Sequence, residues 1–171
     1  MLNVIVRPET VRDQEAIRRV NELAFGRPAE AVIVDTLRGS TTYVPELSVV
    51  AEADGQIVGY ALFSEVTVRG QPGSWTLVAL GPIAVLPEFQ KQEIGRQLIE
   101  TGLKRAAELG YGAAVLIGHP TYYPRFGFVP ASRFGLKSTF QVPDDVFMAR
   151  LLRPDGLDGI AGTVIYPPPF G

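Results

Sequence analysis

The chain contains no cysteine, one histidine and one tryptophan among its 171 residues. Without cysteine, disulfides, thiolate metal sites and a cysteine nucleophile are all excluded. A single histidine excludes a metal site built from several imidazoles, and no stretch has the loop spacing of oxygen ligands. We therefore expect no metal, and chemistry that relies on hydroxyl, carboxylate and backbone groups.

Neither charge of one sign nor a long apolar run dominates the sequence. Its 16 basic and 18 acidic residues give a formal net charge of -2, so no basic excess predicts a nucleic-acid or anionic-membrane partner. Residues 1–7 contain too few apolar side chains for a signal peptide or a membrane span. We therefore expect a cytoplasmic protein that binds neither nucleic acid nor membrane.

What is present is the composition of a globular protein, with 46% apolar and 20% charged residues. A chain of 171 residues is long enough to bury a sizeable core. No Pro-, Gly- or Ser-rich linker divides it. We expect residues 1–171 to form a single domain.

Three segments have the apolar spacing of helices. The first is expected at residues 11–25, after a capping box formed by Thr10 and Asp13. The second is expected within residues 28–39. The third, residues 94–109, has one apolar face and one charged face, so it should pack against a sheet.

Alternating or wholly apolar runs predict the strands, and Pro8 should end the first of them. We expect strands at residues 2–7, 47–53, 56–68, 74–85, 113–117, 144–152 and 159–166. Asp54-Gly55 is typical of a tight hairpin turn, and a second turn is expected at residues 70–73. The polar residues 40–45 should form a loop. Because a helix joins the strand at residues 74–85 to the strand at residues 113–117, these two strands should lie parallel.

The segment around Gly81-Pro82 has features of a binding site. Proline cannot donate to a strand ladder, so the strand must be bulged or at an edge there, which frees neighbouring backbone groups. The next loop runs into a helix that begins near Glu93, and such an end attracts anions. Gly95 has no Cβ to obstruct a phosphate. An ordinary strand-to-helix turn would fit the same spacing.

Residues 80–128 resemble the acyl-CoA-binding core of the GCN5-related N-acetyltransferases (GNAT). The loop pattern of that family is Arg/Gln-x-x-Gly-x-Gly/Ala, and Gln90 and Gly95 match its outer positions. Leu-Gly-Pro-Ile-Ala-Val at residues 80–85 and Tyr-Tyr-Pro-Arg-Phe-Gly-Phe at residues 122–128 resemble a group of predicted acetyltransferases, most of unassigned substrate. The resemblance implies a mixed α/β fold, with a twisted, mostly antiparallel sheet and helices on both faces.

The resemblance also implies that the chain binds acetyl-CoA as acyl donor. In the family, the strand before the loop pairs with the pantetheine arm, which here implies Ile83, Ala84 and Val85. The loop and helix start would hold the pyrophosphate through Gln90, Lys91, Gln92, Glu93, Ile94, Gly95 and Arg96.

Glu93 stands where the family usually has its first glycine. A carboxylate about 5 Å from a phosphate charge would oppose binding by roughly 3 kcal/mol before screening, at an effective dielectric of about 20. The helical wheel, however, places Glu93 with Arg96 and Gln97 on the solvent side, where we expect Glu93 to point away from the ligand and pair with Arg96. We hypothesise that cofactor affinity is retained but is lower than with glycine at this position.

Tyr123 matches a tyrosine that the family often places at the start of a short helix. The pattern is Tyr-x-x-x-Gly-Phe, completed here by Gly127 and Phe128. The resemblance implies that Tyr123 contacts the cofactor and protonates the departing thiolate. A half-buried packing role would also explain Tyr123, and for Tyr122, one residue outside the pattern, we expect core packing.

A base is needed because the amine must be neutral to attack. The family often uses a glutamate on the strand before the loop, but residues 75–85 contain no acid. Glu22 and Glu30, on the helices that wall the acceptor site in this family, are candidates, as is His119, because histidine is the residue type best suited to proton transfer near neutral pH. Solvated glutamates and a turn histidine would explain the same residues, with water or backbone carbonyls carrying the proton.

The expected activity is transfer of an acetyl group from acetyl-CoA to a primary amine, by direct attack in a ternary complex. The acceptor is expected to be a small-molecule or peptide amine. The alternative is a catalytically silent acyl-CoA-binding sensor or interaction module, which Glu93 and the missing strand acid favour. Dimers are common in the family, so both a monomer and a homodimer agree with the resemblance.

Overall fold

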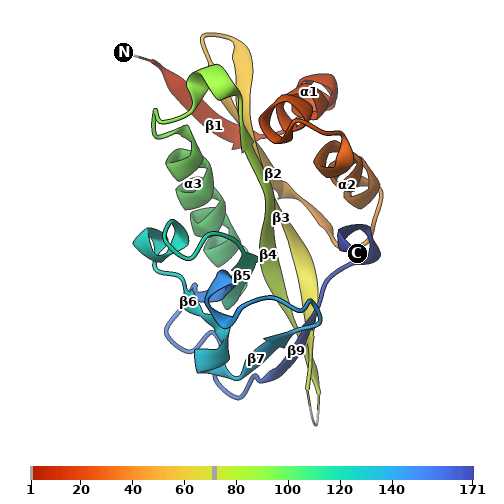
Figure 1. Cartoon of the computed structure of the whole chain (residues 1–171), viewed down its shortest axis with the longest axis vertical. Helices are drawn as coiled ribbons and strands as arrows, with labels where there is room; N and C mark the ends of the chain where they lie inside the picture. Colours follow the sequence, from red (N-terminus) through yellow and green to blue (C-terminus); the bar gives the residue numbers. More distant parts are fainter. Residues whose placement is uncertain (1, 71–72) are drawn as a thin grey trace. The chain divides into compact units, whose positions relative to one another are not determined.

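The computed structural model describes residues 2–70 and 73–171 (Figure 1). The chain forms two compact units, one of Met1–Ser64 and Gly81–Arg105 and the other of Glu65–Leu80 and Ala106–Gly171. The helices are η1 (Val11–Asp13), α1 (Gln14–Phe25), α2 (Ala29–Arg38), η2 (Pro87–Phe89), α3 (Ile94–Glu108), η3 (Tyr123–Phe126), η4 (Ala131–Phe134), η5 (Asp144–Val146) and η6 (Pro168–Phe170). The strands are β1 (Val4–Pro8), β2 (Tyr43–Ala53), β3 (Gln56–Arg69), β4 (Ser74–Val85), β5 (Ala113–Ile117), β6 (Val129–Pro130), β7 (Leu136–Ser138), β8 (Phe147–Leu151) and β9 (Gly162–Ile165).

In the first unit, β1, β2 and β3 form an antiparallel ladder. Val6 pairs with Ala51 across β1 and β2, and Val50 pairs with Tyr60 across β2 and β3. Helices α1 and α2 lie on one side of these strands and α3 lies on the other (Figure 1). This arrangement confirms the mixed α/β fold with helices on both faces of a mostly antiparallel sheet.

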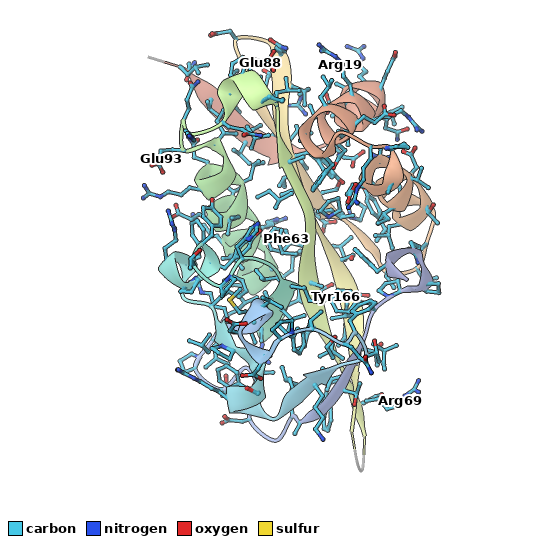
Figure 2. The ribbon with its side chains drawn as sticks, viewed as in Figure 1. Arg19, Phe63, Arg69, Glu88, Glu93 and Tyr166 are labelled. Carbon is cyan, nitrogen blue, oxygen red and sulfur yellow. The ribbon has the colours of Figure 1, made fainter. Side chains whose placement is uncertain are left out.

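Close packing against α3 occupies one face of β3. A Cβ at Gly59 would lie 3.0 Å from Leu98 Cδ1, so that α3 approaches the strand where a side chain is missing. At the other end of this contact, Phe63 lies between β3 and α3 (Figure 2). A Cβ at Gly102 would lie 2.6 Å from Phe63 Cζ. Two glycines therefore make room for the helix.

A buried polar chain occupies the opposite face of β3, since neighbouring strand residues point to opposite faces. The hydroxyl of Tyr60 lies 2.6 Å from Ser48 Oγ, which in turn donates to the carboxylate of Glu9. Arg38 of α2 donates to both oxygens of that carboxylate, at 3.0 and 3.2 Å. The chain therefore links α2 to β2 and β3.

The same polar chain continues to the other N-terminal helix. Arg38 NH1 donates to Asp35 Oδ1 at 2.9 Å, and the second oxygen of Asp35 accepts from Arg18 of α1. Tyr60 stays neutral, because burial raises its pKa far above the usual value. Alternating positive and negative groups thus join α1, α2 and the strands.

The second unit contains the parallel pairing that the sequence predicts. Val78 of β4 pairs in parallel with Ala114 of β5, while β5 and β8 pair antiparallel at Val115 and Ala149. β9 pairs antiparallel with the end of β3 and parallel with β7. The buried core of this unit includes Val66, Leu77, Val115, Leu136, Phe147 and Val164.

The first predicted helix is in fact two elements, η1 followed by α1. The capping box is confirmed, with Thr10 N donating to Asp13 Oδ2 at 2.7 Å. Asp13 also accepts from Arg7 at 2.7 and 3.1 Å. This pairing with Arg7 lowers the Asp13 pKa from 3.8 to about 2. Arg7 also reaches Glu52 on β2, at 3.0 Å, so the cap is tied to the strands.

One strand end agrees with the prediction and another does not. β1 ends at Pro8, as predicted, and the proline is itself the last paired residue, opposite Val49. Proline is tolerated there because β1 is the last strand in its order, where no neighbour requires the missing N–H. Residues 40–45 are not all loop, because β2 begins at Tyr43, opposite Ser64. The polar residues and the proline in this segment are typical of a loop, but pairing with β3 makes its second half part of a strand.

Other boundaries differ more near the C-terminus. β8 and β9 are shorter than the predicted runs 144–152 and 159–166, because η5 precedes β8 and pairing with β7 limits β9. The predicted turn at residues 70–73 includes residues 71 and 72, which lie outside the described residues. In the described ranges, no helix is long and apolar enough to cross a membrane.

Candidate active site

The end of β4 leads directly into the loop before α3. β4 continues through Gly81-Pro82, whose peptide bond is cis, and ends at Val85. Ile83 and Val85 are half-buried and Ala84 is buried. After the strand, η2 turns the chain towards α3. The predicted pantetheine-binding residues therefore belong to the last part of β4.

Gln90 contacts this strand end through its side chain. Its Nε2 donates to the carbonyl of Val85 at 3.1 Å. On the other side of the turn, Leu86 N donates to Val58 O at 2.8 Å, which fixes the chain to β3. Gln90 thus occupies a backbone acceptor in the stretch that the sequence assigns to the cofactor.

Helix α3 begins with a row of free backbone donors. Gln97 N donates to Glu93 O at 3.1 Å, which is the first hydrogen bond of the helix. Within residues 2–70 and 73–171, no acceptor is found for the backbone N–H groups of Lys91, Gln92, Glu93, Ile94, Gly95 and Arg96. The start of a helix with such unpaired donors binds anions, and the helix dipole favours negative charge there.

Two residues of this loop have left-handed backbone conformations. Lys91 has φ 63° and Glu93 has φ 68°. An L-residue with a side chain is less stable there than glycine, by about 1 kcal/mol. This conformation explains why glycine would suit the position of Glu93. The sequence alone does not reveal it, because side-chain residues seldom adopt positive φ.

The side chain of Glu93 points into solvent, as the helical wheel predicts (Figure 2). It is 67% exposed and lies 3.4 Å from Arg96 NH1. Arg96 also contacts Glu100, with 3.1 Å between Nε and Oε1. The predicted pairing with Arg96 is therefore confirmed, and it partly neutralises the carboxylate at the helix start.

Glu22 and Glu30, the glutamates considered as bases, lie on α1 and α2 of the first unit. Glu22 is half-buried, and its backbone carbonyl accepts from Gly26 N at 2.9 Å. Glu30 accepts from Arg27 Nε at 3.0 Å and from Arg27 NH2 at 2.5 Å. Arg27 lowers the Glu30 pKa. A lowered pKa makes Glu30 a weaker proton acceptor.

The second unit holds the other two candidates. His119 is exposed, and its carbonyl accepts from Tyr122 N at 3.2 Å, which forms the turn before η3. Tyr123 begins η3, the short helix that the sequence predicts, and Gly127 ends it with φ 88°. Burial, with a smaller contribution from Tyr122, raises the Tyr123 pKa to about 12. Its hydroxyl therefore stays protonated at neutral pH.

Tyr122 is half-buried and not part of the core that the sequence predicts for it, although its ring edge packs against Phe126 at a centroid distance of 5.3 Å. Arg125 lies over the Tyr122 ring, 4.6 Å from its centroid, and donates to the Tyr122 carbonyl at 2.9 Å.

Across the described part of the chain, no cluster of three acidic or histidine side chains could hold a metal ion.

Comparison with known sequences gives a consistent set of matches. The family model of the acetyltransferase (GNAT) domain matches residues 45–130. YhbS, an uncharacterized N-acetyltransferase of Escherichia coli K12, is 34% identical over 95% of this chain and 96% of its own length. YjhQ, another from the same strain, is 37% identical over 78% of this chain and 74% of its own.

Comparison with solved structures agrees. The crystal structure of YhbS from Escherichia coli in complex with CoA has a TM-score of 0.91 at 33% identity, covering 99% of this chain and 93% of that one. A GNAT family acetyltransferase from Brucella melitensis, in complex with acetyl-CoA, has a TM-score of 0.81 at 33% identity, covering 99% of both chains.

Proposed function

Because this chain belongs to the GNAT acetyltransferase family, we propose that it acetylates a primary amine by direct attack of the amine on acetyl-CoA. The row of unpaired backbone N–H groups between Lys91 and Arg96 carries this proposal. Such a row suits a pyrophosphate. The CoA and acetyl-CoA bound in the two similar crystal structures support the same ligand here.

Two segments of the first unit would hold acetyl-CoA. The amides of residues 91–96 would bind the pyrophosphate, and the backbone of Ile83, Ala84 and Val85 would pair with the amide-rich pantetheine arm. Because the Gln90 side chain donates to the Val85 carbonyl, a pantetheine amide that used this acceptor would displace it. Gln90 would then be free to contact the ligand.

Tyr123 would contact the cofactor and act as acid. The reaction forms a carbon–nitrogen bond and breaks the carbon–sulfur bond, so the thiolate gains a proton and the amine loses one. With a pKa raised to about 12, the Tyr123 hydroxyl is available as a donor throughout the neutral range. Protonation of the sulfur is the role we assign to it.

For the proton that the amine loses, we favour Glu22 and His119 over Glu30. Glu30 is bound by Arg27 through the side-chain hydrogen bonds described above, and its pKa is lowered. Among the described residues, no ion pair occupies Glu22 or His119. Glu22→Gln and His119→Gln should therefore reduce turnover more than Glu30→Gln, at a pH near 7.

The test of the proposed function is release of coenzyme A thiol from acetyl-CoA in the presence of small-molecule and peptide amines. We expect release that depends on the amine. Acetyl-CoA that raises the melting temperature without thiol release with any amine would replace this proposal with a catalytically silent acyl-CoA-binding module.

The role of Tyr123 has its own test. Tyr123→Phe keeps the ring and removes the hydroxyl, so we expect turnover to fall about 100-fold, with acetyl-CoA affinity unchanged by calorimetry. Tyr122→Phe is the matched control, since the Tyr122 ring packs against Phe126, and it should retain turnover. Unchanged turnover in Tyr123→Phe would remove this residue from the mechanism.

A further inference from the structure

The ring of Tyr123 lies against a glycine that the sequence analysis did not single out. Gly118 follows β5, and its N–H donates to Val146 O at 2.9 Å. A Cβ at Gly118 would overlap Tyr123 Cε2 and would lie 2.9 Å from Cδ2. The ring therefore fills the space that any other residue at position 118 would need.

Three other aromatic rings lie close to the Tyr123 ring. Tyr122 meets it edge-on at a centroid distance of 5.0 Å, and Phe128 does so at 6.2 Å. Phe126 lies 6.5 Å away in a tilted arrangement. Such contacts fix the plane of a ring. Gly118 adds a fourth close neighbour of the same ring.

The orientation of the Tyr123 ring is set by packing, and no hydrogen bond of its hydroxyl to the described residues contributes to it. Among residues 2–70 and 73–171, no hydrogen bond from the Tyr123 hydroxyl is found. An acid whose donor atom is not held by a partner depends on its ring for direction, and misplacement of about 1 Å can cost a large part of the rate.

We infer that Gly118 is a positioning residue, whose missing side chain admits the Tyr123 ring and thereby sets the direction of its hydroxyl. This inference rests on the proposed acid role of Tyr123. Gly118 does not have left-handed φ. Alanine can therefore adopt its backbone conformation, and the severe overlap that Gly118→Ala creates is with the Tyr123 ring, Leu116 Cδ1 being the next atom at 3.3 Å.

The experiment is a double-mutant cycle in the full chain, with Gly118→Ala, Tyr123→Phe and the double variant. We expect Gly118→Ala to lower kcat at least about tenfold with KM for acetyl-CoA unchanged. In the Tyr123→Phe background the same substitution should have no further effect on kcat, because the hydroxyl that it misdirects is absent. Gly39→Ala is the control, since a Cβ there would lie 3.8 Å from Thr36 O, and it should resemble the wild type.

Different outcomes separate this inference from the proposed function. If Tyr123→Phe keeps full turnover, the acid role fails and the inference fails with it. If Tyr123→Phe is impaired but Gly118→Ala is not, only the inference is overturned. An equal loss from Gly118→Ala in both backgrounds, or a parallel rise in KM for acetyl-CoA, would also overturn it.

A second measurement covers a Gly118→Ala variant that folds too poorly for kinetics. In a Tyr123→Ala background, Gly118→Ala should lower the melting temperature much less than it does in the wild type, because the overlap with the ring is then absent. If Gly118→Ala costs as much in both backgrounds, the added methyl group collides elsewhere, for instance with Leu116 Cδ1 at 3.3 Å, and the inference is overturned.

Discussion

Glu93 has two properties that a glycine at the start of α3 would lack. Its left-handed backbone costs free energy in the folded protein, and its carboxylate lies at a helix end that we propose for a pyrophosphate. Arg96 compensates the charge in part, but the pair is exposed to solvent and is therefore weak. The backbone conformation lowers the stability of the protein, and the carboxylate opposes binding of the ligand. The two effects can be measured separately.

Glu93→Gly should bind acetyl-CoA more tightly than the wild type, by about fivefold after solvent screening. It should also raise the free energy of unfolding by about 1 kcal/mol, because glycine adopts φ 68° without strain. Calorimetric titration and denaturant unfolding measure the two effects.

Glu93→Gln separates charge from backbone in this experiment, because it removes the carboxylate and keeps the side chain. It should give most of the gain in affinity and little of the gain in stability. Glu88→Gln changes another exposed carboxylate, on η2, and is the control. Equal or weaker binding by Glu93→Gly would contradict the expected effect.

Asp13 gives the protein a pH-dependent contribution to stability. Its pKa is about 2 in the folded protein because Arg7 binds the carboxylate, against the usual 3.8. A carboxylate whose pKa is lower in the folded than in the unfolded protein stabilises the fold at any pH above its unfolded pKa. Asp13 should therefore contribute roughly 2 kcal/mol to the free energy of unfolding at pH 5 and above. This contribution should be lost as the pH falls from about 4 to about 2.

Asp13→Asn should lower the free energy of unfolding by roughly 2 kcal/mol at pH 7 and flatten its decline between pH 4 and pH 2. Denaturant unfolding at a series of pH values measures both. Asp158→Asn, at an exposed position, should leave the profile unchanged. A variant that keeps the wild-type decline would show that another carboxylate is responsible.

At the scale of single residues, the sequence predicts side-chain chemistry better than backbone conformation. The pairing of Glu93 with Arg96 follows from helical spacing, and the Thr10–Asp13 capping box follows from a local motif. The left-handed φ of Lys91 does not follow, because nothing in a lysine encodes it. The partner of Glu30 was missed too, although Arg27 stands only three residues away, since such spacing is common on solvated helices.

At the scale of elements, the contact between β3 and α3 depends on what is absent from the helix. Glycine in a helix interior usually costs about 1 kcal/mol relative to alanine. At Gly102 the balance is reversed, because a Cβ would lie 2.6 Å from Phe63 Cζ and 2.8 Å from Phe63 Cδ1. Phe63 is fully buried, so its ring has little freedom to move.

Gly102→Ala should therefore destabilise the protein by about 1–3 kcal/mol, in spite of the higher helix propensity of alanine. Denaturant unfolding measures the change. In a Phe63→Leu background the cost should fall, since the smaller side chain leaves room for the methyl group. A stabilised Gly102→Ala would mean that α3 shifts along the sheet without loss of packing.

Element types were predictable where hydrophobic periodicity is long and unbroken. The hairpin of β2 and β3 around Asp54-Gly55, helix α3 and strand β5 all lie close to the expected positions. β7 was not predicted, because its residues, 136–138, are too few to show a period and depend on pairing with β9. Tyr43 was misassigned for the related reason that its partner, Ser64, is remote in sequence.

At the scale of the whole molecule, binding of acetyl-CoA to the native state should raise the stability of the full chain. A ligand at about 100 times its Kd adds about 2.7 kcal/mol if it binds only the folded protein. We expect acetyl-CoA and coenzyme A to raise the melting temperature by several degrees, with acetate at the same concentration as the control. No shift at millimolar acetyl-CoA would contradict the proposed cofactor.

Long-range polar contacts are the part of the molecule that sequence reasoning missed. Ser48 and Glu9 are 39 residues apart, and Glu9 and Arg38 are 29 apart. Glu9 follows β1, Ser48 lies on β2 and Arg38 on α2, so no local spacing joins them. The family resemblance predicts the order of helices and strands around the proposed cofactor site, and it says nothing of the charges that tie α1 and α2 to the strands.

The polar chain from Tyr60 to Arg18, which is buried at Tyr60, Ser48 and Glu9, bears on attempts to re-engineer this protein. If α1 and α2 were exchanged for the equivalent segment of a relative, Glu9 would remain as a buried carboxylate without a positive partner, unless the new segment supplied an arginine in the place of Arg38. Grafts should therefore carry Glu9, Ser48 and Tyr60 together with the helices, or replace the whole set with apolar side chains. Helices α1 and α2 therefore cannot be exchanged independently of the strand residues that they contact.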